Sequence, residues 1–79
     1  MNVRVKLMGT LPTHYSGSYS ASGIEVALPD GACIADLVEK MGISKLRVGL
    51  ATINGKLVHA QDTIPAGAAV KFFHKIAGG

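Results

Sequence analysis

The sequence ends in two glycines, the residues whose type and position most directly suggest chemistry. The last six residues read HKIAGG, so Gly78 and Gly79 stand directly before the terminal carboxylate. Glycine has no side chain and adopts backbone geometries that other residues avoid, which makes this carboxylate unusually accessible to another protein. The alternative is a frayed C-terminus without function, as small domains commonly have. The two glycines alone leave both interpretations open.

Cys33 is the only cysteine, and it stands at the start of a predicted helix. The positive end of a helix dipole can lower a thiol pKa and produce a reactive thiolate. We favour the simpler interpretation, in which Cys33 is a small, half-buried residue that caps the helix. A single cysteine also excludes an internal disulfide framework and a cysteine-rich metal or iron–sulfur site.

The other candidates for chemistry are histidines and carboxylates, and none forms a recognisable site. His14, His59 and His74 fall on a predicted loop and two different strands, without the spacing of a metal site. Asp36 and Glu39 lie near the polar face of the predicted helix, which is typical of a solvated charge pair. The sequence also lacks a glycine-rich phosphate loop. It therefore predicts no catalytic residue, no metal ligand and no enzyme active site.

The composition is that of one small globular domain. Of the 79 residues, 48% are hydrophobic and only 16% are charged, which excludes a disordered chain. The net charge of +3 favours acidic partners. Nucleic acid is a poor fit, because the basic residues are scattered and the aromatic content of 5% leaves few stacking surfaces.

The N-terminal residues do not have the pattern of a signal peptide. Arg4 and Lys6 interrupt the apolar residues, so no signal peptide is expected. No apolar run approaches the roughly 20 residues that span a bilayer. We therefore expect a cytoplasmic protein that does not bind membranes.

Hydrophobic periodicity predicts an α+β fold in the order β-β-α-β-β-β. Alternation over the first strand and an Asn54-Gly55 pair between two later apolar segments are the clearest strand and hairpin signals. One helix would pack on one face of a mixed sheet of four to five strands. The expected strands are 2–9, 23–28, 47–53, 56–60 and 68–76, the helix is 33–42, and 10–22 is a loop.

The last predicted strand, AAVKFFHKI, places its two phenylalanines on opposite faces, because side chains alternate along a strand. Phe72 is predicted to join the core beneath the helix. Phe73 then lies on the open face between two lysines, which is typical of an anchor for an acidic partner. The alternative is that Phe73 packs under the loop at 11–22. The predicted partner interface comprises Lys71, Phe73, Lys75 and Ile76, with Ile76 at the edge of the folded body.

Several segments, in their order along the whole chain, resemble the MoaD/ThiS-type ubiquitin-like sulfur carriers of molybdopterin and thiamine biosynthesis. These segments are VRVKL, IADLVEKMGI, INGKLV, DTIPAG with the following AAV, and the closing IAGG. The resemblance implies a single ubiquitin-like β-grasp domain over 1–79, with a flexible C-terminal tail at 77–79. It also implies that the first and last strands lie side by side and parallel at the sheet centre.

The same resemblance implies a role for the C-terminus. In this family a ubiquitin-activating-type enzyme uses ATP and Mg²⁺ to adenylate the terminal carboxylate, and a sulfur donor protein then converts it to a thiocarboxylate. Gly79 would carry this group, while Gly78 and Ala77 would keep the tail narrow enough to enter the partner's nucleotide site. The carrier itself would bind no cofactor. A synthase large subunit or a thiazole synthase would receive the sulfur.

The sequence departs from the usual family pattern in three places. Cys33 stands where threonine or serine often caps the helix, and His74-Lys75 replaces the prolines frequently seen before the tail. The segment 11–22 is a long loop without the extra helix of some molybdopterin-type members. The chain length and this loop favour the molybdopterin or tungstopterin branch over the thiamine thiazole branch.

Two functions of other classes stay open beside the sulfur carrier. A ubiquitin-like protein modifier would use the same adenylated Gly79, but a lysine amine would attack it and form an isopeptide bond. A plain interaction module would keep its full activity without the tail, and its two glycines would be incidental.

Overall fold

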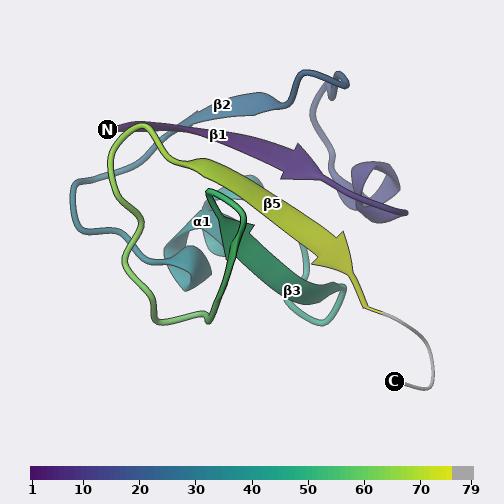
Figure 1. The fold of residues 1–79 in the computed structure, drawn as a ribbon. Coiled ribbons are helices and arrows are strands. Elements are labelled where there is room, and N and C mark those ends of the chain that lie inside the picture. The colour runs from purple at the N-terminus through teal and green to yellow at the C-terminus, as the bar shows by residue number, and fades with distance from the viewer. Residues whose placement is uncertain (76–79) are drawn as a thin grey trace.

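The computed structural model describes residues 1–75, whose elements follow the predicted order with one short 3-10 helix added (Figure 1). Residues 76–79 lie outside the described residues, so the expectations for Ile76 and for the tail are not tested by the structure. The first elements are β1 (Asn2–Leu7), η1 (Leu11–His14), β2 (Ile24–Ala27) and α1 (Ile34–Met41). The later elements are β3 (Val48–Ile53), β4 (Lys56–Val58) and β5 (Ala69–His74).

The strands form one mixed sheet in the order β2-β1-β5-β3-β4. β1 and β5 pair in parallel at the centre, with Val5 beside Val70 and Leu7 beside Phe72. The other three pairings are antiparallel. The β3–β4 hairpin turns at Asn54, whose φ of 51° is the left-handed geometry that this short turn requires. The structure thus confirms the α+β class, the mixed sheet and the parallel centre.

The core lies between α1 and one face of the sheet, with α1 behind β5 and β3 in Figure 1. The apolar stripe of the helix is buried as predicted. Phe72 is fully buried, whereas Phe73 is half-buried and does not belong to the core. The buried stripe comprises Ile34, Leu37, Val38 and Met41, and β1 contributes Val3, Val5 and Leu7.

The predicted loop before β2 contains a turn of 3-10 helix, so the expectation of an unbroken loop is wrong for residues 11–14. Pro12 lies in the first turn of η1, where its missing N–H costs no hydrogen bond. Leu11 is fully buried and anchors this turn to the core. Farther along, the Tyr19 hydroxyl accepts a hydrogen bond from the Leu7 N–H (2.9 Å). These contacts fasten the segment to the end of β1.

Cys33 caps α1, as the sequence predicts. Its backbone N–H (3.0 Å) and its thiol (3.3 Å) both donate to the Asp36 carboxylate. The backbone hydrogen bond, and after it the thiol, holds the pKa of Asp36 below its ordinary value. The first helical N–H groups, those of Ile34 and Ala35, donate to the carbonyls of Asp62 and Ala60. The helix N-terminus is therefore fully engaged in holding the fold.

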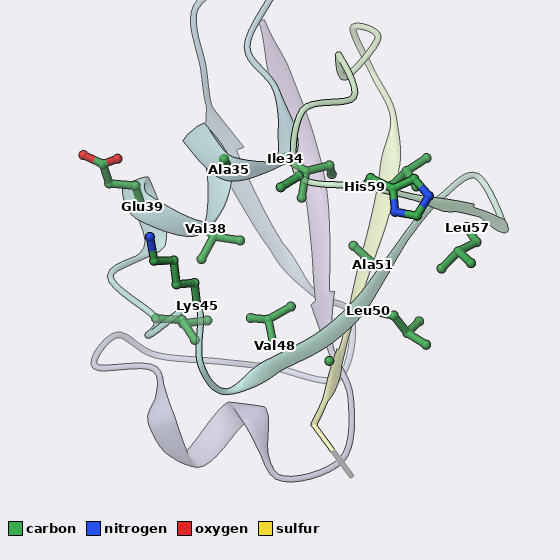
Figure 2. Close-up of a pocket in the computed structure, with 14 residues that line it drawn as sticks. Ile34, Ala35, Val38, Glu39, Lys45, Val48, Leu50, Ala51, Leu57 and His59 are labelled. Atoms are coloured by element: carbon green, nitrogen blue, oxygen red, sulfur yellow. The ribbon is translucent and has the colours of Figure 1, made fainter. Parts of the chain in front are cut away.

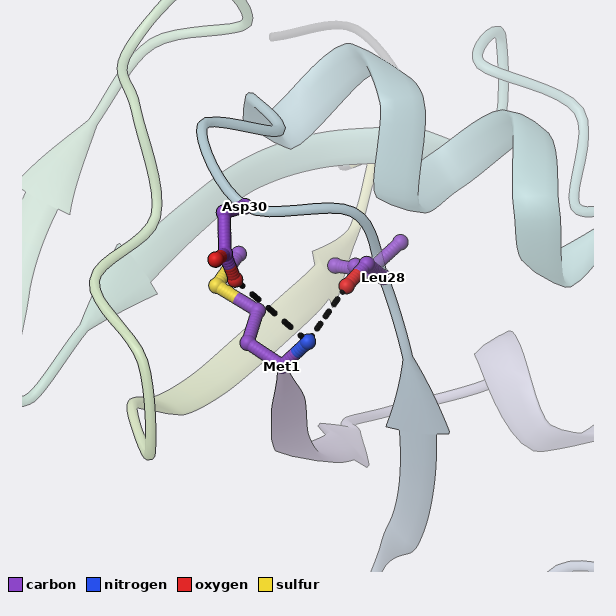
Figure 3. A network of polar contacts seen from close by, with 3 residues as sticks. All are labelled: Met1, Leu28 and Asp30. Atoms are coloured by element: carbon purple, nitrogen blue, oxygen red, sulfur yellow. Dashed lines mark hydrogen bonds and ion pairs between the residues drawn. The ribbon is translucent and has the colours of Figure 1, made fainter.

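The first residue is tied to the segment that leads into the helix (Figure 3). The α-ammonium of Met1 donates to the Leu28 carbonyl at 2.7 Å, and the Leu28 N–H donates back to the Met1 carbonyl at 2.8 Å. Asp30 lies 3.6 Å from the ammonium, but its side chain is 93% exposed. The hydrogen bonds therefore contribute more than the ion pair to fixing the start of β1.

Substitution of the two phenylalanines of β5 tests which face of the sheet each side chain occupies. Phe72→Ala should lower the free energy of unfolding by about 3–5 kcal/mol, because truncating a large core side chain leaves a cavity. Phe73→Ala should cost less than half as much, because Phe73 is only half-buried and lies on the opposite face. Chemical denaturation of both variants measures the two losses. Equal losses would contradict the assigned facing.

Asp36 should give the stability a pH dependence. Because its pKa is lowered in the folded state, its ionised form stabilises the fold fully above the ordinary carboxyl pKa. This contribution is lost as the pH falls through the folded-state pKa. The stability difference between the wild type and Asp36→Asn should therefore be constant above about pH 4 and shrink below it. Urea denaturation at a series of pH values checks this, and a difference that persists unchanged into acid would count against it.

Candidate functional site

The face of the sheet opposite α1 carries an apolar and basic surface. Register places Phe73 of β5 beside Leu50 of β3, and Lys71 beside both Thr52 of β3 and Lys6 of β1. Leu50 is 45% exposed, and Leu57 of β4, which pairs with Thr52, is 62% exposed. We call this surface the open-face patch and define it as Lys6, Leu50, Leu57, Lys71 and Phe73.

The structure places the predicted interface residues partly as expected. Phe73 lies on the opposite face from Phe72, but it is half-buried rather than freely exposed, with Leu50 opposite it in register. Lys71 and Lys75 are exposed. Ile76 and the predicted tail lie outside the described residues. The assignment of these residues to a partner interface stays a prediction.

Sequence reasoning missed three members of the open-face patch. Lys6 was visible as a polar position of an alternating strand, but its neighbour Lys71 depends on the parallel pairing of β1 and β5. Leu50 and Leu57 come together with Phe73 only because β3 pairs with β4 and β5. An alternation pattern identifies which residues share a face within one strand, and it carries no information on neighbouring strands.

The basic side chains of the open-face patch have no acidic partners within the described residues. The ion pair found in residues 1–75 joins the Met1 ammonium and Asp30, and it involves neither Lys6 nor Lys71. Like charges on neighbouring strands destabilise a sheet. The charges of the two lysines therefore do not stabilise the isolated fold, and they are available to attract an acidic surface.

A second feature is a groove of about 720 Å³ between α1 and the β3–β4 hairpin (Figure 2). Figure 2 shows Val38 of the helix and Val48 of β3 facing this space, with Glu39 and Lys45 at its outer edge. His59 is the only histidine in its lining, and no cysteine lines it. The groove can accept apolar groups, but it lacks the paired acid and base of a catalytic centre.

The histidines do not converge in the structure. His14 ends η1, His59 follows β4, and His74 ends β5. Within residues 1–75 no group of three or more histidine, cysteine, aspartate or glutamate residues could hold a metal ion. In the same part of the chain, no helix has the length and apolar character needed to cross a membrane.

The C-terminal part of the chain leaves the sheet from its central strand β5. β5 ends at His74, and the Lys75 N–H still donates to the Arg47 carbonyl at 2.9 Å. The chain is therefore fixed by hydrogen bonding up to the last described residue. The open-face patch and this exit point both belong to β5, so a protein that binds the patch would lie close to the base of the C-terminal segment.

Comparison with known proteins supports the fold assignment. The sequence matches no protein-family model and no curated protein. Among solved structures, SAMP1 from Haloferax volcanii is similar over 100% of both chains, with a TM-score of 0.72 and 17% identity. A Pyrococcus furiosus protein described as "Putative molybdopterin converting factor, subunit 1" is similar over 95% of this chain and 98% of its own, with a TM-score of 0.71 and 20% identity.

These likenesses cover nearly the whole of each chain, with TM-scores above 0.7. At such low identity they establish the architecture and not the activity. The chain therefore has the β-grasp fold of ubiquitin-like and MoaD-like proteins.

Proposed function

We propose that the protein is a sulfur carrier whose Gly79 carboxylate is adenylated by a partner enzyme and converted to a thiocarboxylate. The observation that carries the proposal is the combination of a β-grasp fold with the sequence IAGG, which begins two residues after the last residue of its central strand β5. A buried strand gives the following residues a rigid base. Two glycines let the carboxylate enter a narrow site in another protein.

The proposed reaction requires little from this chain beyond an accessible C-terminal carboxylate. A carboxylate is a poor electrophile, so its oxygen must first attack the α-phosphorus of ATP and release pyrophosphate. The terminal sulfur of a persulfide on the donor protein then attacks the Gly79 carbonyl carbon and displaces AMP. A thiol reductant cleaves the S–S bond of the resulting acyl disulfide, which releases the donor and leaves the thiocarboxylate on Gly79. Because Gly79 has no side chain, nothing beside that carbon blocks the approach. The partner supplies ATP, Mg²⁺ and catalysis, and we expect these reactions to take place in the cytoplasm.

The open-face patch would recognise the partner. Phe73 with Leu50 and Leu57 provides the apolar contact, and Lys6 with Lys71 provides charge complementary to an acidic surface. The same patch could serve the adenylating enzyme and the sulfur acceptor in turn. The description of the Pyrococcus neighbour favours the molybdopterin or tungstopterin branch, with a synthase large subunit as acceptor, over thiamine thiazole and its synthase.

A protein modifier conjugated through Gly79 is the second candidate. The likeness to SAMP1, a ubiquitin-like small archaeal modifier, favours it. The two functions share the adenylated intermediate and differ only in the nucleophile that displaces AMP: a sulfur donor gives a thiocarboxylate, and a lysine amine gives an isopeptide bond.

One experiment separates the candidates. The protein is incubated with the adenylating enzyme encoded in the same genome, ATP, Mg²⁺ and a sulfur donor, and its intact mass is then measured. A mass gain equal to the exchange of one oxygen for one sulfur at Gly79 supports the carrier. Lysine conjugates in cell lysate without that mass gain support the modifier. An unchanged mass without conjugates would support a plain interaction module.

The tail should be essential for activity and dispensable for stability. Deletion of Gly79, or Gly78→Leu, should abolish ATP–pyrophosphate exchange, because the carboxylate no longer reaches the α-phosphate. Thermal stability should be nearly unchanged, since every core residue of the described chain lies at or before Phe72. Ala66→Leu, which adds similar bulk at an exposed turn, is the control. Wild-type exchange in either tail variant would rule out this mechanism.

The open-face patch should contribute to partner binding. Phe73→Ala should weaken binding to the adenylating enzyme or synthase subunit by at least about 1–2 kcal/mol, because central aromatic residues dominate interface energies. Leu46→Ala is the matched control, since Leu46 is 73% exposed and lies before β3, outside the patch. Titration calorimetry measures both affinities. Equal effects of the two variants would exclude Phe73 as an anchor.

A further inference from the structure

β3 carries one extra residue where it pairs with the end of β5. Leu50 lies opposite Phe73 and Val48 lies opposite His74, so Gly49 forms a β-bulge. Strict alternation would put Val48 on the open face with Leu50. The bulge instead turns Val48 towards the helix, where it packs against the core.

Gly49 lies directly against the backbone of the residues that lead into the tail. A Cβ added at Gly49 would stand 2.8 Å from the His74 carbonyl oxygen and 3.0 Å from the Lys75 Cα. Gly49 is not among the residues with positive φ, so space rather than backbone geometry requires a glycine here. The atoms in the way are backbone atoms, which cannot rotate aside. Any side chain at this position must therefore displace the end of β5 or the bulge itself.

The other side of this strand end is also held. The imidazole of His74 lies against Gly9, where an added Cβ would overlap the ring. Gly9 has a φ of 62°, which most side chains disfavour, so both geometry and space require a glycine there. The Lys75 N–H donates to the Arg47 carbonyl at 2.9 Å. The backbone of β3 and the chain after β1 thus fix His74 and Lys75 from two sides.

We infer that Gly49 is a positioning residue, which sets the path of the backbone at His74 and Lys75 and so the direction in which the C-terminal segment enters the partner. This inference rests on the proposed function of Gly79. The C-terminal segment starts from Lys75, so a displacement there shifts the point from which Gly79 must reach the α-phosphate. Misplacement of reacting groups by about 1 Å can lower a rate by about 100-fold.

The test compares wild type, Gly49→Ala and Gly17→Ala in ATP–pyrophosphate exchange at a series of carrier concentrations. Gly17 is a matched control, because it too lacks positive φ and its added Cβ would meet only the Tyr15 ring, nearest at 2.8 Å from the hydroxyl oxygen. Tyr15 lies two residues away in the same segment, and its half-buried ring belongs to a side chain that can rotate, unlike the backbone atoms beside Gly49. The alanine is therefore tolerated there without moving β5.

Gly49→Ala should lower the maximal exchange rate at least about tenfold, because the carboxylate is misaligned. The half-saturating carrier concentration should stay within about twofold, because the open-face patch still binds the enzyme. Hydrogen exchange of the Lys75 amide should accelerate in Gly49→Ala, since its bond to Arg47 is strained. Gly17→Ala should match the wild type in all three measurements.

A wild-type maximal rate in Gly49→Ala would overturn the positioning role. Absence of exchange with the wild-type protein would instead count against the proposed function, so the two failures are distinguishable. Should Gly49→Ala not fold, as circular dichroism would show, hydrogen exchange of the Lys75 amide in the wild-type protein decides instead. The close approach of Gly49 and the bond to the Arg47 carbonyl require this amide to be protected. Unprotected exchange at Lys75 would overturn the positioning role.

Discussion

The parallel pairing of β1 and β5 is the constraint on which the rest of the structure depends. Parallel neighbours cannot be joined by a tight turn, so the chain must leave the sheet and return. Here β2, α1, β3 and β4 all lie in that connection. Because Leu7 and Phe72 meet in register at the buried centre, the first and last strands are fixed to each other. The C-terminal segment therefore starts from a central strand of the sheet.

Alternation lets this one strand serve two purposes at once. Val70 and Phe72 face the helix and hold the core, while Lys71 and Phe73 face away from it. A change on one face can therefore alter stability or recognition separately. The bulge at Gly49 extends the same logic to β3, because it returns Val48 to the core while Leu50 stays beside Phe73. The residues that stabilise the core and those proposed to bind a partner are therefore neighbours in the same strands, but they lie on opposite faces of the sheet.

Most of the elements could be predicted from the sequence, because their signals are local: the helix from its apolar stripe and the hairpin from Asn54-Gly55. The parallel centre came only from the family resemblance, since no local pattern specifies it. The 3-10 turn at 11–14 was missed because it depends on the burial of Leu11. The bulge was missed because strict alternation in RVGLATI places Val48 with Leu50. Only pairing with β5 reveals the extra residue.

The open-face patch contains features that lower the stability of the isolated fold. Lys6 and Lys71 lie side by side on paired strands, and a sheet built for stability alone would separate these charges. Leu50 and Leu57 likewise stay substantially exposed. Local conflicts of this kind concentrate at functional sites. An acidic and apolar partner of the kind proposed above would neutralise the charge and cover the leucines together.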